Sequence, residues 1–180
     1  GNSLFFISDR NDILKTGNIN KPEIHSVEQS DIYTLDLNSN LIQRLTETSH
    51  NEMYPCISSD GETLAYISDE NGINNIYLQN INEKLPKPIT NIITGITQLS
   101  WNGDDSQLIF TGFFNRGYDI YVLNNPLEKL NDQIEVPLAS WVDKKSNLEL
   151  LHGEEFVENK NYINEDKYRN YVFSDFEYDI

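Results

Sequence analysis

Short segments in which hydrophobic and polar residues alternate recur along the chain, separated by turns rich in Gly, Asp and Asn. Alternation with a period of two is typical of β-strands that bury one face. The most regular landmark is an Ile-Tyr pair, found at Ile32-Tyr33, Ile76-Tyr77 and Ile120-Tyr121, at intervals of 44 residues. Self-similarity at such a spacing is typical of repeat architectures. We therefore expect an array of similar units that presents a binding surface, rather than a single catalytic constellation.

The second unit shows the expected strands most clearly. The alternation predicts strands at residues 54–58, 63–68, 75–79 and 87–90. Asp60-Gly61 has the composition of a tight hairpin turn between the first two strands. Pro88 lies in the fourth strand, and proline is tolerated mainly in edge strands, so this strand is expected at the outside of its sheet.

The third unit repeats this order. Its strands are predicted at residues 98–101, 107–111 and 119–123, with a turn at residues 102–104 and a fourth strand at residues 134–137.

The first unit is incomplete, because residues 1–4 align with residues 61–64 and no segment corresponds to the first strand. We expect an unpaired sheet edge there, and hence a fragment of a longer protein. The same unit carries an insertion at residues 11–30, between its second and third strands. Loops of this length in a compact repeat are often functional.

Four short antiparallel strands in a period of about 40 to 45 residues predict a β-propeller. The fold class is therefore all-β, with about three four-stranded antiparallel blades, the first lacking its inner strand. The propeller is expected to span residues 1–137, with blades at about residues 1–46, 52–90 and 95–137. Residues 138–166 are predicted to be an acidic polar linker. Residues 167–180 either begin a further β-rich segment or wrap back along the propeller.

One rim of the predicted propeller is the candidate interaction surface. Strands alternate in direction within a blade, so the loop between the second and third strands lies on the same face as the connection to the next blade. The insertion therefore shares a rim with residues 50–52, 93–95 and 115–116. An exposed aromatic pair beside an arginine is typical of an interface hot spot. The candidate residues are His25, His50, Phe113, Phe114, Asn115 and Arg116.

The charge of the chain restricts its partners. The formal net charge is −16, and the 13 basic residues are scattered. Nucleic acids and anionic lipids are recognised by clusters of Lys and Arg, so we expect a protein partner and no nucleic acid. No run of about 18 apolar residues predicts a transmembrane helix, and the first residues do not resemble a signal peptide. Cys56, the only cysteine, lies in an apolar strand, where a small buried side chain is expected.

Motifs for catalysis, metal binding or cofactor binding are absent from the sequence. The three histidines are far apart, the turn carboxylates do not follow a calcium-loop pattern, and neither a nucleophile elbow nor a phosphate-binding loop occurs. We expect no catalytic, cofactor-binding or metal-binding residues. Tyr33, Tyr77 and Tyr121 recur at one repeat position, which indicates a packing role.

Residues 57–69 followed by residues 75–78 resemble the TolB-like, WD-type propeller repeat, with its Ser-Pro-Asp-Gly turn, Ala-Phe strand, Ser-Asp step and Ile-Tyr strand. Ser59 replaces the usual proline, and residues 100–103 of the third unit depart further. The resemblance covers residues 1–137. It implies a non-enzymatic, protein-binding propeller in the periplasm or cell envelope of a bacterium, with outer-membrane association through sequence outside this chain left open.

The alternative function is the N-terminal gating propeller of a serine peptidase similar to prolyl oligopeptidases. An α/β-hydrolase segment after residue 180 would decide for this alternative, and a β-rich continuation would decide against it. Whether the full-length protein is an enzyme therefore stays open.

Overall fold

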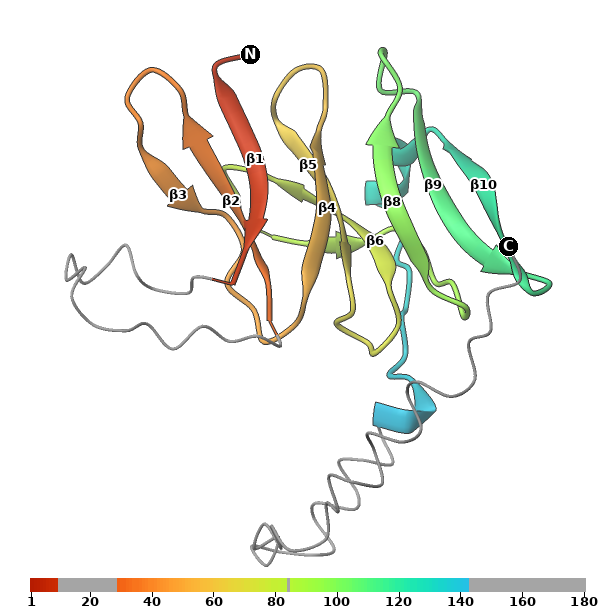
Figure 1. Ribbon diagram of the computed structural model, residues 1–180. Helices are drawn as coiled ribbons and strands as arrows, with labels where there is room; N and C mark the ends of the chain where they lie inside the picture. The colour runs from red at the N-terminus through yellow and green to blue at the C-terminus, as the bar shows by residue number, and fades with distance from the viewer. Residues whose placement is uncertain (10–28, 84, 143–180) are drawn as a thin grey trace, which may run out of the picture. The chain divides into compact units, whose positions relative to one another are not determined.

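The computed structural model describes residues 1–9, 29–83 and 85–142 (Figure 1). Residues 1–142 form one compact unit. Except for residues 29 and 30, the predicted insertion lies outside the described residues. So do residues 143–180, so the predicted domain boundaries, linker and terminal segment stay predictions.

Three antiparallel sheets make up the described part of the chain. The first contains, in spatial order, β1 (Ser3–Ser8), β2 (Asp31–Asp36) and β3 (Ile42–Arg44). The second contains β4 (Glu52–Ile57), β5 (Thr63–Ser68), β6 (Asn75–Asn80) and β7 (Lys87–Pro88). The third contains β8 (Ile96–Trp101), β9 (Gln107–Phe114) and β10 (Gly117–Asn124).

This arrangement confirms the predicted fold class: the chain is an all-β propeller segment. The recurrent Ile-Tyr pairs lie in β2, β6 and β10, the third strand of each repeat. Among the described residues the first sheet has no inner strand, as the alignment predicts, and β1 lies beside β4, the inner strand of the second sheet (Figure 1).

The predicted fourth strand of the third sheet, at residues 134–137, is wrong. After β10 the chain turns at Asn125, whose backbone is left-handed with φ 51°, and forms the 3-10 helix η1 (Pro126–Asn131). Residues 133–139 then form no strand. Their backbone carbonyls instead accept hydrogen bonds from the second sheet's side chains, since Asn91 donates to Glu135 over 3.2 Å and Asn71 donates to Pro137 over 3.1 Å.

The inner strands β4 and β8 begin two residues earlier than predicted. Each contains a bulge, where the register shifts between Met53 and Cys56 in β4 and between Thr97 and Leu99 in β8. A bulge interrupts the alternation of side chains between the two faces. The residues before the bulge therefore do not continue the alternation on which the prediction relied.

The core lies between neighbouring sheets. One cluster of buried side chains joins the second and third sheets, and another joins the first and second. In each sheet an aromatic residue of β1, β5 or β9 stacks on the tyrosine of the strand that follows it, with centroids 5.7 to 6.0 Å apart. The pairs are Phe6–Tyr33, Tyr66–Tyr77 and Phe110–Tyr121. Such pairs contribute about 0.5 to 1.5 kcal/mol beyond the burial of their area.

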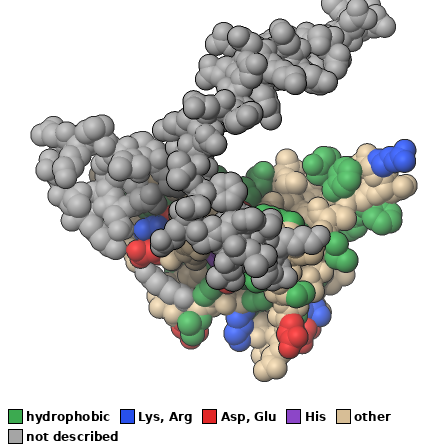
Figure 2. All heavy atoms as spheres, turned by 90° about the horizontal axis from the view of Figure 1, so that it is seen from below, with side chains coloured by type: hydrophobic (Ala, Val, Ile, Leu, Met, Phe, Trp, Pro, Cys, Tyr) green, Lys and Arg blue, Asp and Glu red, His purple; other side chains and the backbone are tan. Residues whose placement is uncertain are grey.

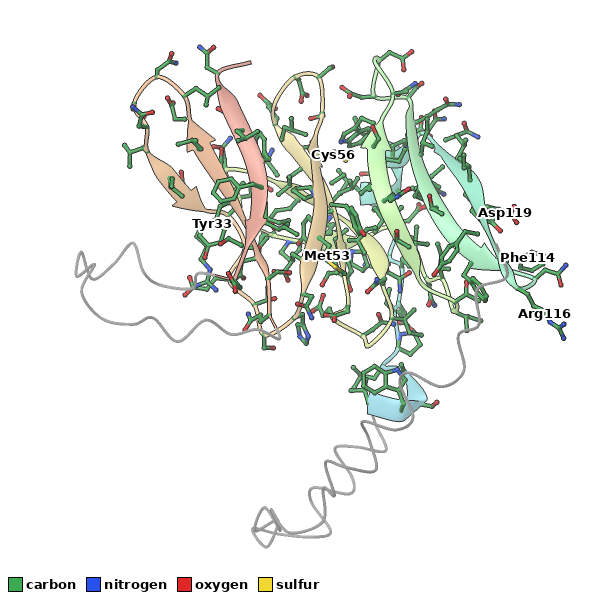
Figure 3. The ribbon with its side chains drawn as sticks, viewed as in Figure 1. Tyr33, Met53, Cys56, Phe114, Arg116 and Asp119 are labelled. Atoms are coloured by element: carbon green, nitrogen blue, oxygen red, sulfur yellow. The ribbon has the colours of Figure 1, made fainter. Side chains whose placement is uncertain are left out.

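Cys56 lies on β4 (Figure 3) and is half-buried. Burial raises the pKa of its thiol to about 12. Within the described residues, no helix is long and apolar enough to cross a membrane.

Candidate interaction surface

The antiparallel pairing places the ends of β5 and β9 and the starts of β4 and β8 at one edge of the sheets, the lower edge in Figure 1. We call this edge the lower rim. Five of the six candidate residues are described and belong to segments at this rim. His25 lies outside the described residues.

The hairpin between β9 and β10 carries four of the candidates. Phe114 pairs with Gly117, so Asn115 and Arg116 form a two-residue turn. Both have left-handed backbones, with φ 47° for Asn115 and 70° for Arg116. This is the backbone pattern of a type I′ hairpin turn, whose twist matches that of the strands. The turn therefore holds the Arg116 guanidinium at the tip of a regular hairpin, beyond the sheet (Figure 3).

Aromatic side chains cover both faces of this hairpin tip. Phe113 is 40% exposed and Phe114 is 65% exposed, and their side chains point to opposite faces of the sheet because they are consecutive strand residues. Phe113 packs edge-on against Tyr118, with ring centroids 5.2 Å apart. Figure 2, seen from below, shows hydrophobic side chains next to a basic one at the right-hand end of the described residues. Phe113, Phe114, Arg116 and Tyr118 form what we call the aromatic tip.

His50 belongs to a different surface. It lies in the link between β3 and β4, and its Nε2 is 3.3 Å from Oγ of Ser49. It lines a depression of about 440 Å³ against the second sheet, together with Glu70, Asn71, Tyr77, Pro86, Pro88, Val136 and Leu138. The structure therefore brings Phe113, Phe114, Asn115 and Arg116 together and does not add His50 to them.

A buried charge cluster lies where the predicted insertion joins β2, and sequence reasoning missed it. Asp31 and Glu52 begin β2 and β4 and are 0% and 1% exposed. Nη2 of Arg44 donates to Asp31 over 2.6 Å, and the Thr48 hydroxyl donates to Oε1 of Glu52 over 2.5 Å. Among the described residues, Oδ1 of Asp31 and Oε2 of Glu52 are buried and have no hydrogen-bond partner.

Burial dominates the titration of both acids. It raises the pKa of Glu52 to about 7, although the hydrogen bond from Thr48 opposes this. It also raises the pKa of Asp31 above its ordinary value, although the hydrogen bond and charge of Arg44 lower it. The repeat contained a signal for this cluster, because Glu52 occupies the position that the buried Ile96 has in the next unit.

A cavity of about 600 Å³ opens between the first and second sheets, at the edge opposite the lower rim. It is lined by Phe5, Leu45, Ile57 and Ile81 and by polar groups around the turn between β4 and β5. Asp36 is the only charged side chain among the described residues that line it.

The fold is similar to that of solved bacterial propellers. A putative TolB from Agrobacterium tumefaciens matches with a TM-score of 0.56 and 16% identity, over 70% of this chain and 43% of that one. TolB from Acinetobacter baumannii matches with a TM-score of 0.50 and 17% identity, over 69% of this chain and 28% of that one. The chain thus spans less than half the length of either protein.

An acylaminoacyl peptidase also matches, with a TM-score of 0.43 and 19% identity, over 60% of this chain and 21% of that one. At these identities the likenesses concern the fold alone. No curated protein matches the sequence. Residues 8–105, more than half of the chain, match the family model described as the dipeptidyl peptidase IV (DPP IV) N-terminal region. The chain therefore belongs to the family of the dipeptidyl peptidase IV N-terminal region.

Proposed function

We propose that this chain is a non-enzymatic protein-interaction propeller of a bacterial cell-envelope protein and that it binds its partner through the aromatic tip. The observation that carries the proposal is the exposure of Phe114 and Tyr118, 65% and 67%, on either side of Arg116. Aromatic residues and arginine are enriched among the residues that dominate binding energy at protein interfaces.

The geometry of the tip supports this role. Its aromatic rings stand on paired strands, and the type I′ turn orders the backbone that carries Arg116. Little conformational entropy is then lost when a partner binds, because the backbone is already ordered. Arg116 is a local cation in a chain of net charge −16, so the partner surface is expected to combine an apolar pocket with a carboxylate.

The cell-envelope setting is supported by the likeness of the fold to two bacterial TolB structures. In this setting the insertion at residues 11–30, with His25, and the surface around His50 remain further contact candidates at the lower rim. They would enlarge an interface that is centred on the aromatic tip.

The second candidate function is a gating propeller of a serine peptidase. The observation that favours it is the family itself, which is described by the N-terminal region of a peptidase. The sequence that follows residue 180 in the full-length protein separates the two functions. An α/β-hydrolase segment with a nucleophile elbow would support the peptidase, and a β-rich continuation would support the interaction protein.

Site-specific crosslinking in the cell envelope tests the proposal. A photoreactive phenylalanine derivative is placed at Phe114 in one variant and at Ile93 in another, since Ile93 is 85% exposed in the link between β7 and β8 at the same rim. We expect position 114 to crosslink to one protein and position 93 to give no such product. Binding of that purified protein should then weaken by at least about tenfold in Phe114→Ala, as at interface hot spots, and stay unchanged in Ile93→Ala.

Equal binding by Phe114→Ala and the unaltered chain would overturn the role of the tip. Crosslinks of equal yield from both positions would show a non-selective rim and would also contradict the proposal.

A further inference from the structure

Among the described residues, the outer edge of β10 has no neighbouring strand, although the equivalent strands of the other two sheets have one. β3 pairs with β2 in the first sheet and β7 pairs with β6 in the second, whereas β10 is the last strand of the third sheet (Figure 1). The three strands are equivalent by the 44-residue repeat. The contacts that cover the corresponding edges of β2 and β6 therefore indicate which groups could cover the edge of β10.

In the first two sheets the outer segment contributes an aliphatic residue followed by threonine. In the first sheet the N–H of Ile32 donates to Oγ1 of Thr46 over 2.8 Å, and the N–H of Leu45 donates to the carbonyl of Ile32 over 2.8 Å. In the second sheet Ile76 takes the place of Ile32. Its N–H donates to Oγ1 of Thr90 over 2.9 Å, and the N–H of Ile89 donates to its carbonyl over 2.9 Å.

A third contact involves the residue before each isoleucine. Oδ1 of Asn75 accepts the Ile92 N–H over 2.7 Å and the Thr90 hydroxyl over 3.0 Å. In the first sheet the residue at the equivalent position is Asp31. An aliphatic residue and a threonine thus bind the N–H and the carbonyl of the isoleucine in both sheets, and in the second sheet a backbone N–H two residues later also binds the Asn75 side chain.

The third sheet displays these three groups without an occupant among the described residues. Asp119 aligns with Asp31 and Asn75, and Figure 3 shows its side chain projecting outward from β10. Ile120 is 77% exposed, whereas Ile32 and Ile76 are 0% exposed. Tyr121 is 37% exposed, although its counterparts are buried. An eight-residue edge strand with a single charge and no proline is poorly protected against the addition of another strand.

We propose that the outer edge of β10 binds an extended strand of a partner polypeptide that carries an aliphatic residue followed by threonine. The strand runs antiparallel to β10. Its threonine hydroxyl accepts the Ile120 N–H, its aliphatic residue donates its N–H to the Ile120 carbonyl, and a later N–H binds the Asp119 carboxylate. This is recognition by strand addition, in which main-chain hydrogen bonds provide affinity and side-chain sites provide specificity. It does not depend on the function of the aromatic tip.

No further segment of the 180 printed residues has this pattern at the position of the third sheet's outer strand. Thr46 and Thr90 already occupy the first two sheets, and no threonine follows Thr111 in the 180 residues. The segment at the position of an outer strand in the third repeat is bound elsewhere, because the Ala139 N–H donates to the Asn71 carbonyl over 2.7 Å in the second sheet. Residues 143–180 therefore cannot supply the aliphatic-threonine pair.

Peptide binding to the full chain tests this proposal. The probe is a labelled synthetic peptide with the sequence of residues 40–49, which contains Leu45 and Thr46, and binding is followed by fluorescence anisotropy. Amide hydrogen exchange at Ile120 reports the position of binding. We expect saturable binding that protects the Ile120 amide. The Thr46→Val peptide should bind at least about tenfold more weakly, since it leaves the Ile120 N–H without an acceptor.

Variants of the chain provide the matched controls. Asp119→Ala should weaken peptide binding several-fold, while Asp104→Ala, which alters an exposed turn at the opposite end of β9, should leave it unchanged. Equal affinity for the two peptides, or no saturable binding, would overturn the proposal. So would protection of the Ile120 amide in the chain alone. If that protection is lost on dilution, a second copy of the chain covers the edge, and if it persists, the chain's own residues do.

Discussion

Backbone conformation at single residues repeats in this chain even where residue identity does not. Tyr54 and Gln98, 44 residues apart, both have left-handed backbones at the bulges of the inner strands. Gly61 has φ 79°, and Asp105, at the same repeat position, has φ 59°. The sequence predicts the turn of the third unit at residues 102–104. Asp105, just after this range, takes the left-handed conformation, and its carboxylate accepts the Ser59 N–H over 2.9 Å.

Arg116 occupies a backbone conformation that glycine would adopt at a lower free-energy cost. Its left-handed backbone, φ 70°, costs free energy for any residue with a Cβ. We predict that Arg116→Gly raises the free energy of unfolding by about 0.5 to 1 kcal/mol, measured by urea denaturation. Arg116→Ala, which removes the charge but keeps the Cβ, should give no such gain. A destabilised Arg116→Gly variant would contradict the conformational argument.

Glu52 makes stability depend on pH. Its pKa is about 7 in the folded protein and 4.5 ordinarily, so between these values the native state holds a proton that the unfolded chain has released. Glu52 therefore contributes stability that is complete below about pH 4.5 and is lost as the pH rises through about 7. The raised pKa of Asp31 acts in the same direction.

Glu52→Gln should therefore flatten the fall in stability between pH 5 and pH 8. The amide cannot ionise, and its oxygen still accepts the Thr48 hydroxyl. We expect the variant to gain about 1 to 3 kcal/mol relative to the unaltered chain over this interval, from urea denaturation at each pH. Glu62→Gln, in the exposed turn between β4 and β5, is the control. An unchanged pH profile in Glu52→Gln would show that another group causes the slope.

At the scale of elements, the third strand of each repeat carries the same Ile-Tyr pattern, but its neighbours differ between the three sheets. On its inner side each of these strands has the same kind of neighbour, because a stacked aromatic pair joins it to the preceding strand in every sheet. The outer neighbour is not the same in every sheet, since β10 lies at an edge of the described third sheet. Equal hydrophobicity along the sequence therefore corresponds to unequal burial in the fold.

The pair Ile76 and Ile120 measures this difference. Ile76→Ala should cost about 2 to 5 kcal/mol, because the side chain is fully buried in the core between the second and third sheets. Ile120→Ala should change stability by no more than about 0.5 kcal/mol, because its side chain is 77% exposed. The free energies of unfolding of both variants are measured by equilibrium denaturation. Similar losses in the two variants would mean that another part of the protein covers β10.

For the whole described molecule, cohesion between sheets depends on a few polar links as well as on the core. The Glu52 N–H donates to the Ser30 carbonyl over 2.9 Å between the first two sheets. Trp101 Nε1 donates to the Cys56 carbonyl over 3.2 Å, and Asp105 accepts from Ser59, between the second and third. Each of these links joins neighbouring sheets through groups that are distant in the sequence.

Several elements could be predicted from the sequence because their signals are local. The β5 strand was predicted with its observed bounds, and β6 to within one residue, since both follow clear alternation between recognisable turns. The exposure of Phe113 and Phe114 was also predictable from their place beside a turn. Tyr118 could have been added, because it follows Gly117 directly in the returning strand.

Other features could not be predicted, because they depend on contacts between distant residues. The two inner-strand bulges shift register against β5 and β9, and the segment after β10 binds to the second sheet instead of extending the third. Glu52 is buried although it is charged, because the neighbouring sheets enclose it together with Thr48.

By itself, the sequence determined the repeat, the all-β class and the order of strands, because a 44-residue period and two-residue alternation are properties of the chain alone. The tertiary structure decided which copies of each repeated position are covered. Burial requires a neighbour, and neighbours come from packing between sheets. For that reason the Ile-Tyr pairs of β2 and β6 lie in the core, while the pair of β10 lies in the edge strand of the described third sheet.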